Sequence, residues 1–152
     1  MACPFFAPSR RLEIAGWIRP PRFPLGDSFG GACHAYPADI VEPPEARQRE
    51  LCNCGYARGR CDRFPLDSAG DAVRFSITGE TRNRLVVVYV VEKDHAPADF
   101  GTLEYWIADA RLEEPCNVVG PVISDVLALQ ARAFLASYLG RKRGQVASSG
   151  RL

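Results

Sequence analysis

The chain is poor in lysine and has no long apolar run. Only two of its 19 basic side chains are lysines, Lys93 and Lys142, and the formal net charge is +1. A charge so close to zero produces no field that would draw the protein to nucleic acid or to an acidic membrane surface. No stretch approaches the roughly 20 apolar residues that a membrane-spanning helix needs. We therefore expect no nucleic-acid partner and no membrane span.

The first residues, MACPFFAPSRR, lack the basic region and the apolar region that make up a secretory signal. We therefore expect a cytoplasmic protein, whose thiols stay reduced. This expectation affects how the six cysteines are interpreted. In a reducing compartment, closely spaced cysteines favour metal binding over disulfide formation.

Sequence motifs of common enzymes are also missing. The chain has no G-x-S-x-G, no H-E-x-x-H and no nucleotide-binding phosphate loop, and GDSFGGAC is interpreted as a turn. Glu92, Asp94 and His95 follow an apolar run, so they could do acid–base chemistry. We expect a solvated turn there instead, although His95 could also be a metal ligand, and we place His34 at the surface. A hydrolytic or transfer enzyme acting through His95 is therefore the less favoured alternative, because the sequence pairs no nucleophile with it.

The composition changes near residue 66. Residues 1–66, named the cysteine-rich lobe here, contain nine of the twelve prolines and five of the six cysteines. Proline excludes long helices and central strands, so this lobe cannot fold by burial alone and needs a cross-link. One short helix is predicted, from Pro43 and Pro44 to Gly55. Cys52 and Cys54 would then lie at its C-terminal end.

Residues 71–143 show regular hydrophobic patterns. Alternation at 73–78 and 103–107, and the apolar run 85–91, predict a three-stranded antiparallel sheet. A helix is predicted from Gly120 and Pro121 to 141–143, with one stripe formed by Val122, Val126, Leu129, Ala133 and Ala136. The fold class is α+β, with a single domain over 1–143 and a disordered tail over 144–152. Because the run 85–91 is apolar throughout, we expect the helix on one face of the sheet and the cysteine-rich lobe on the other.

The cysteines carry the strongest chemical signal. Thiolates bind zinc and iron–sulfur clusters, and four of them complete either site. The run from Cys52 through Cys54 to Cys61 can supply up to three ligands, and Cys33 and Cys3 can come from elsewhere in the lobe. Buried unligated thiols and disulfides remain alternatives. Cys116 lies far away in a Glu-Glu-Pro-Cys loop, so we do not expect it to be a ligand.

The segments CPFF, PLGDSFGGAC, LCNCGYARGRCDRFP and EKDHAPADFGTLEY occur in this order. In this the chain resembles a small family of uncharacterised bacterial proteins over most of its length. The resemblance implies that Cys3, Cys33, Cys52 and Cys61 form the recurring set, because a bulky apolar residue is more usual at the position of Cys54. It implies no activity.

Iron–sulfur and zinc sites use the same thiolates. Irregular spacing from distant segments favours a cluster, with [4Fe–4S] as the preferred type, and Arg58, Arg60 and Arg63 could offset its negative charge. The sequence thus predicts an electron carrier or an accessory subunit of a redox complex, with a protein partner. The alternative is a zinc-stapled module that binds a protein without catalysing a reaction.

Overall fold

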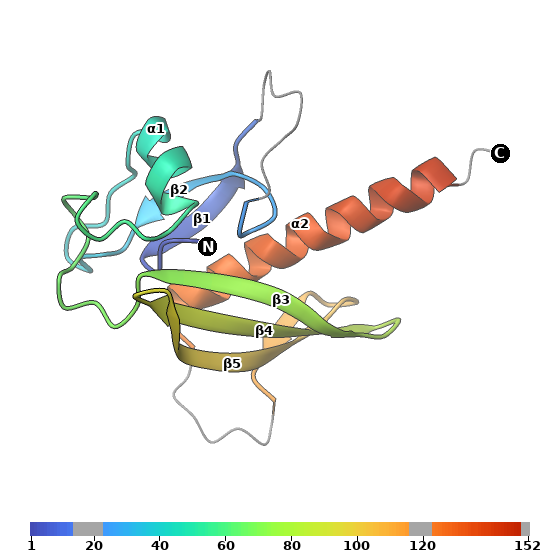
Figure 1. Ribbon diagram of the computed structural model, residues 1–152. Coiled ribbons are helices and arrows are strands. Elements are labelled where there is room, and N and C mark those ends of the chain that lie inside the picture. Colours follow the sequence, from blue (N-terminus) through green and yellow to red (C-terminus); the bar gives the residue numbers. More distant parts are fainter. Residues whose placement is uncertain (14–22, 116–122, 150–152) are drawn as a thin grey trace.

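The computed structural model describes residues 1–13, 23–115 and 123–149. It contains two antiparallel sheets and a long C-terminal helix (Figure 1). In chain order the elements are β1 (Phe6–Arg11), β2 (Phe29–Cys33), α1 (Glu45–Arg47), η1 (Gln48–Cys52), β3 (Ala72–Glu80), β4 (Arg84–Lys93), β5 (Ala96–Trp106), β6 (Arg111–Glu113) and α2 (Asp125–Ser149). The predicted α+β class with a C-terminal helix is observed, but the single three-stranded sheet was wrong.

The small sheet pairs β1 with β2, both in the lobe that was expected to be irregular. Pro8 in β1 and the two glycines of β2 gave a pattern typical of turns. A proline is tolerated in a two-stranded sheet because each strand has a free edge, and the register shifts between Pro8 and Arg10. A Cβ on Gly31 would lie 2.0 Å from the Ala7 carbonyl oxygen, so this close pairing requires glycine.

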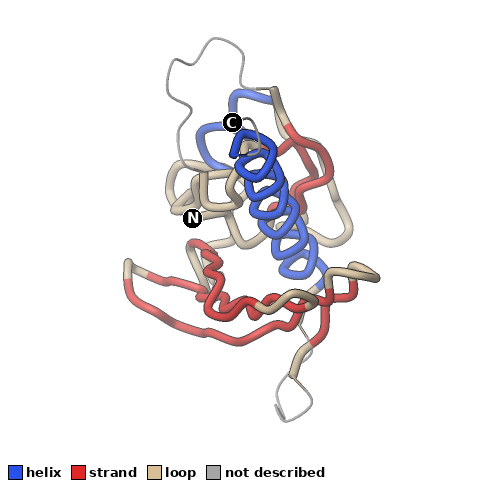
Figure 2. The backbone as a smooth tube through the Cα atoms, turned by 90° about the vertical axis from the view of Figure 1, so that its right-hand side faces the viewer, coloured by secondary structure: helices blue, strands red, loops and turns tan. Residues whose placement is uncertain are grey.

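The large sheet has the order β3-β4-β5-β6. Its first three strands correspond to the predicted ones, although β5 ends at Trp106, one residue before the predicted end, and β6 is too short to show an alternating pattern in the sequence. The described parts of the lobe and α2 lie on the same side of this sheet (Figures 1 and 2). Accordingly, Leu85 and Val87 are fully buried, whereas Val86 and Val88 are only half-buried. The expectation that the lobe covers the opposite face was wrong, since valine is favoured in strands whether or not both faces are covered.

Helix α2 begins at Asp125, where the Ser124 hydroxyl accepts a hydrogen bond from the Leu127 N–H at 3.2 Å. Such a cap satisfies one of the unpaired N–H groups of the first turn. The predicted start at Gly120 and Pro121, and Val122 of the predicted stripe, lie outside the described residues. At its other end, α2 continues through 144–149, where the sequence predicts a disordered tail; residues 150–152 are outside the described ranges.

The same helix is buried on two sides. Phe134 stacks against Phe75 of β3, with ring centroids 5.7 Å apart. Gln130, which is fully buried, instead contacts the beginning of the lobe. Leu129 is 41% exposed and Ala136 is also exposed, so the predicted stripe was wrong at these two positions. A helix inserted between two layers does not show a single apolar face.

One hydrophobic core joins the two halves of the chain. It contains Phe6, Leu25 and Phe29 from the lobe together with Val73 and Leu85 from the large sheet. None of the helices in the described ranges is long and apolar enough to cross a membrane.

Candidate metal centre

The loop that carries Cys52 and Cys61 begins at a helix end. The predicted short helix is observed as α1 followed by η1, which is a π-helical turn ending at Cys52. Gly55 follows with a φ of +69°, a conformation that glycine adopts without strain. The chain then turns back, and the Cys61 N–H donates to the Ala57 carbonyl at 2.8 Å.

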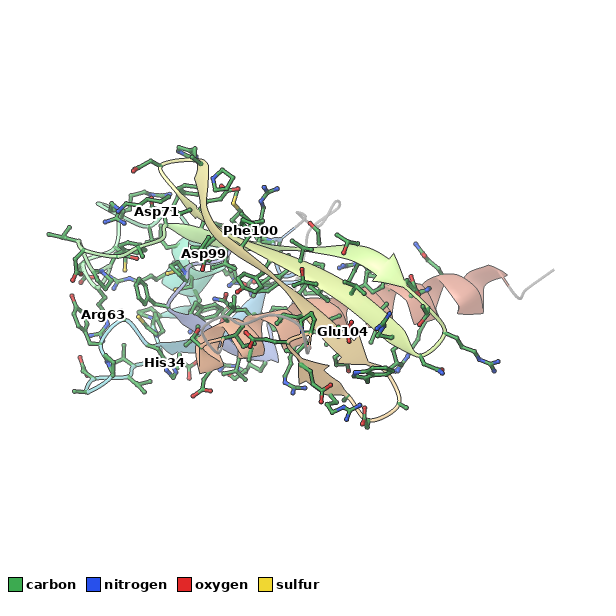
Figure 3. The ribbon with its side chains drawn as sticks, turned by 90° about the horizontal axis from the view of Figure 1, so that it is seen from below. His34, Arg63, Asp71, Asp99, Phe100 and Glu104 are labelled. Carbon is green, nitrogen blue, oxygen red and sulfur yellow. The ribbon has the colours of Figure 1, made fainter. Side chains whose placement is uncertain are left out.

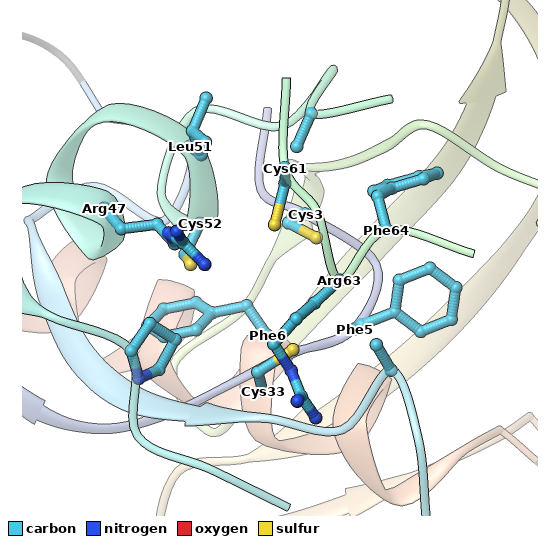
Figure 4. Close-up of a pocket in the computed structure, with 13 residues that line it drawn as sticks. Cys3, Phe5, Phe6, Cys33, Arg47, Leu51, Cys52, Cys61, Arg63 and Phe64 are labelled. Carbon is cyan, nitrogen blue, oxygen red and sulfur yellow. The ribbon is translucent and has the colours of Figure 1, made fainter. Parts of the chain in front are cut away.

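Four cysteines line one cavity (Figure 4). Cys3 comes from the first residues, Cys33 from the end of β2, Cys52 from the end of η1, and Cys61 from the loop that follows. The cavity has a volume of about 20 Å³. Its apolar wall includes Phe5, Phe6, Leu51, Ala57 and Phe64. The structure thus brings together the four residues that the family resemblance implied.

Disulfides do not connect the cysteines of the described ranges, where Cys3, Cys33, Cys52, Cys54 and Cys61 are all free. Cys54 points elsewhere: it is exposed, and its Sγ lies 3.4 Å from the Arg49 carbonyl oxygen. It is not among the residues that line the cavity. Cys116 lies outside the described residues.

The local electrostatics keep the deepest thiols protonated when no metal is bound. Burial raises the pKa of Cys3 and of Cys52 from the usual 9.0 to about 12, and the neighbouring thiols add to the effect in both cases. Cys33 and Cys61 are among these neighbours for both thiols. A metal that binds here has to displace these protons, so its binding is expected to strengthen as the pH rises.

Two arginines also line the cavity. Arg47 is held by Asp62 at 2.7 Å, and Arg63 by Asp39 at 2.8 Å. The Nε atom of Arg63 is buried and has no hydrogen-bond partner among the described residues. An N–H donor in this position can serve a thiolate or an inorganic sulfide.

Of the arginines that were expected to offset the charge of the site, only Arg63 lines the cavity. Arg58 instead pairs with Asp71 at 2.7 Å and covers the outer side of the Phe64 ring, 5.1 Å from its centroid. Arg60 is exposed. Arg47 was missed, because it lies on the short helix and not in the cysteine loop.

Three buried amides fix the segments that carry the cysteines. Asn53 binds both the N–H and the carbonyl of Phe29, at 2.9 and 2.8 Å, and so ties η1 to β2. Gln48 accepts from the Gly31 N–H at 3.0 Å. Gln130 donates to the Cys3 and Phe6 carbonyls, both at 2.7 Å. Sequence reasoning missed all three, because asparagine and glutamine are mostly surface residues.

His95 lies apart from the cavity. Together with Asp94 it forms the two-residue connection between β4 and β5, and both residues have positive φ, 52° and 62°. These angles are those of a type I′ hairpin turn. The His95 ring stacks on Tyr56, with centroids 4.3 Å apart. His34 follows β2 and is partly exposed. Its backbone N–H donates to the Phe5 carbonyl.

Glu92, the third residue of the possible acid–base group, is buried at the end of β4. It accepts a hydrogen bond from the Tyr56 hydroxyl and pairs with Arg74 at 3.0 Å. Asp94 donates its backbone N–H to Asp71 at 2.9 Å. These contacts tie the cysteine loop to the large sheet through Tyr56.

As the side chains stand, the described residues contain no group of three or more Cys, His, Asp or Glu that could hold a metal ion directly. Searches against protein-family models, curated proteins and solved structures find no match to this chain.

Proposed function

We propose that Cys3, Cys33, Cys52 and Cys61 bind an iron–sulfur cluster, of the [4Fe–4S] type, and that the protein carries electrons or serves as an accessory subunit of a redox complex. The observation that supports this proposal is the convergence of four free thiols on one apolar cavity. Four thiols from four separate segments around one cavity supply the number of ligands that a cysteine-bound cluster requires.

The spacing of the ligands favours a cluster over a single zinc ion, because Cys3, Cys33, Cys52 and Cys61 come from separate segments at irregular intervals. Their side chains line one cavity of about 20 Å³ (Figure 4). That volume holds little more than one water molecule, so a cluster requires the cysteine side chains to move apart. Arg47 and Arg63 offset the negative charge that four thiolates bring.

The buried and the partly exposed residues of the site would have different roles toward a bound cluster. A bound cluster would supply one-electron chemistry. Cys3 and Cys52 are buried and, with Phe6 and Phe64, keep water from the inner side. Cys33 and Cys61 are partly exposed, so their side is the shorter route for an electron to the surface. Four protein ligands leave no open metal position for a substrate, which favours electron transfer over catalysis.

The metal content tests the proposal. We expect that protein purified without oxygen, or reconstituted with iron and sulfide, contains about four iron atoms per chain. Charge transfer from thiolate to iron should give an absorbance at about 400 nm. One zinc per chain and no colour would replace the proposal with a zinc-stapled binding module. Protein that retains its fold and takes up neither metal would contradict both.

Single substitutions test the ligands. Cys61→Ser is expected to lose the iron and to lower the stability, because metal-binding energy at such a site is also folding energy. Cys54→Ser is the matched control: it lies seven positions before Cys61 in the same loop, outside the cavity. It should keep a full complement of iron. If Cys54→Ser loses iron and Cys61→Ser does not, the ligand set is wrong.

A further inference from the structure

A second, larger cavity shares a wall with the cysteine site. This groove has a volume of about 560 Å³ and lies between the lobe and the β4–β5 end of the large sheet. Phe5 and Ala35 line both it and the cysteine cavity. The segment 65–70 forms one side, where a Cβ on Gly70 would lie 2.3 Å from the Val91 side chain. Glycine therefore permits the close approach that shapes the groove floor.

The walls of the groove are apolar and its charges are negative. Pro4, Phe5, Pro65, Val91 and Ala98 provide the apolar surface. Asp67 lies on one side and Asp99 of β5 on the other, and no lysine or arginine of the described ranges lines the groove. Figure 3 shows Asp99 nearer than Glu104 to the end of the sheet where the lobe lies.

Neither carboxylate is held in an ion pair, although the Arg58 guanidinium donates to the Leu66 and Ser68 carbonyls on either side of Asp67. Asp67 and Asp99 are exposed, and neither forms an ion pair with any described residue. The contact of Asp99 is a local one, with the Phe100 N–H at 2.8 Å. By contrast, Asp39 and Asp62 are paired with the two arginines that line the cysteine cavity.

We propose that this groove binds a segment of a protein partner in which arginine or lysine side chains alternate with apolar ones. The two unpaired carboxylates receive the cations and exclude an acidic partner, and the apolar walls receive the neighbouring side chains. Leu66 stands between Pro65 and Asp67 and is 85% exposed. It extends the contact surface beyond the groove, which a protein can use and a small molecule cannot.

Because the two cavities share a wall, a partner bound in the groove lies next to the cysteine site. A partner seated in the groove contacts Phe5 and Ala35, which also line the cysteine cavity. The inference that the partner exchanges electrons with this protein rests on the proposed function. The inference that the groove binds a cationic segment is independent of it. Exposed ion pairs contribute little each, so we expect weak, salt-sensitive binding, as suits a transient contact.

A synthetic peptide of alternating leucine and arginine, labelled for fluorescence anisotropy, is the probe. Its control is the same peptide with citrulline in place of arginine, which keeps the shape and removes the charge. We expect binding of the arginine peptide by the full chain, weakened about two- to fivefold by Asp67→Asn and by Asp99→Asn. Asp109→Asn, on the exposed β5–β6 turn, is the matched protein control and should bind normally.

Equal binding of the citrulline peptide would overturn the proposal. So would equal weakening by Asp109→Asn, or the absence of binding by protein that keeps its fold. Iron is measured on the same samples, so a failure of the cluster proposal and a failure of the groove proposal give separate results. Protein that binds the peptide but no iron would retain the groove and lose the redox role.

Discussion

Arg63 is the side chain whose chemistry at the site is most specific, because its buried Nε–H has no partner in the described structure. If a cluster binds, this N–H and the guanidinium charge both favour the reduced form, which carries one more negative charge. We expect Arg63→Met to make the reduction potential more negative. Arg63→Lys should give a smaller shift, since it keeps the charge and loses the planar donor.

A redox titration of the reconstituted variants measures this effect. Arg60→Met is the matched control, because Arg60 lies in the same loop but is exposed and does not line the cavity. A shift for Arg60→Met as large as that for Arg63→Met would show that the effect is general charge and not contact with the site.

Tyr56 predicts a dependence of stability on alkaline pH. Burial, followed by the hydrogen bond to Glu92, raises the pKa of Tyr56 from the usual 10.0 to about 12. The folded state thus holds this proton more tightly than the unfolded state does. The resulting stabilisation is complete below about pH 10 and is lost as the pH rises toward 12. Tyr56→Phe lacks the titrating group.

Chemical denaturation at several pH values between 9 and 11.5 tests this prediction. We expect the free energy of unfolding to fall more steeply in the original protein than in Tyr56→Phe, while the thiols contribute equally to both. Parallel curves would mean that the Tyr56 hydroxyl titrates alike in the folded and unfolded states.

At the scale of elements, the turn of the β4–β5 hairpin contacts the cysteine loop through the stacked rings of His95 and Tyr56. His95→Ala removes the stack on Tyr56, which is worth about 1 kcal/mol. We expect a loss of stability of that size with unchanged metal content, because His95 does not line the cysteine cavity. Thermal unfolding and iron analysis of the variant check both parts. A fall in iron at full folding would make His95 part of the site after all.

The elements differ in how well they could be predicted from the sequence. The strands around Phe75 and Leu103 were predictable because apolar residues alternate there, and the strand around Val87 because it lies in a continuous apolar run. The pairing of β1 with β2 was not, since it depends on contacts between segments about twenty residues apart. Proline and glycine locally indicate a turn. Asp94 and His95 lack the glycine that usually marks a type I′ turn.

The cysteines of the site could be predicted from the sequence, but the residues that hold them in place could not. Cysteine has few roles in a reducing compartment, so Cys52 and Cys61 were candidates from spacing alone. The amides that hold them were not candidates: nothing local distinguishes a buried Asn53 or Gln130 from a surface one. Arg47 was likewise hidden, because a helix face is defined only once the helix is packed.

At the scale of the whole molecule, one core includes both the cysteine-rich lobe and the large sheet. The first residues connect them directly: the Ala2 N–H donates to the Val73 carbonyl and the Cys3 N–H to the Cys52 carbonyl. We therefore expect the cluster and the fold to be lost together on heating. Absorbance near roughly 400 nm and far-ultraviolet circular dichroism should give one common transition. Loss of colour well below the melting temperature would show that the lobe opens by itself.

The hydrogen bonds from Gln130 to the Cys3 and Phe6 carbonyls join segments that lie far apart in the sequence. A ribosome makes all four cysteines before Gln130, and the last of them, Cys61, lies well before it. The segment that holds Cys3 therefore lacks this support until α2 has been made. We expect the cofactor to be inserted only after Gln130 has left the ribosome, and not into the shorter growing chain.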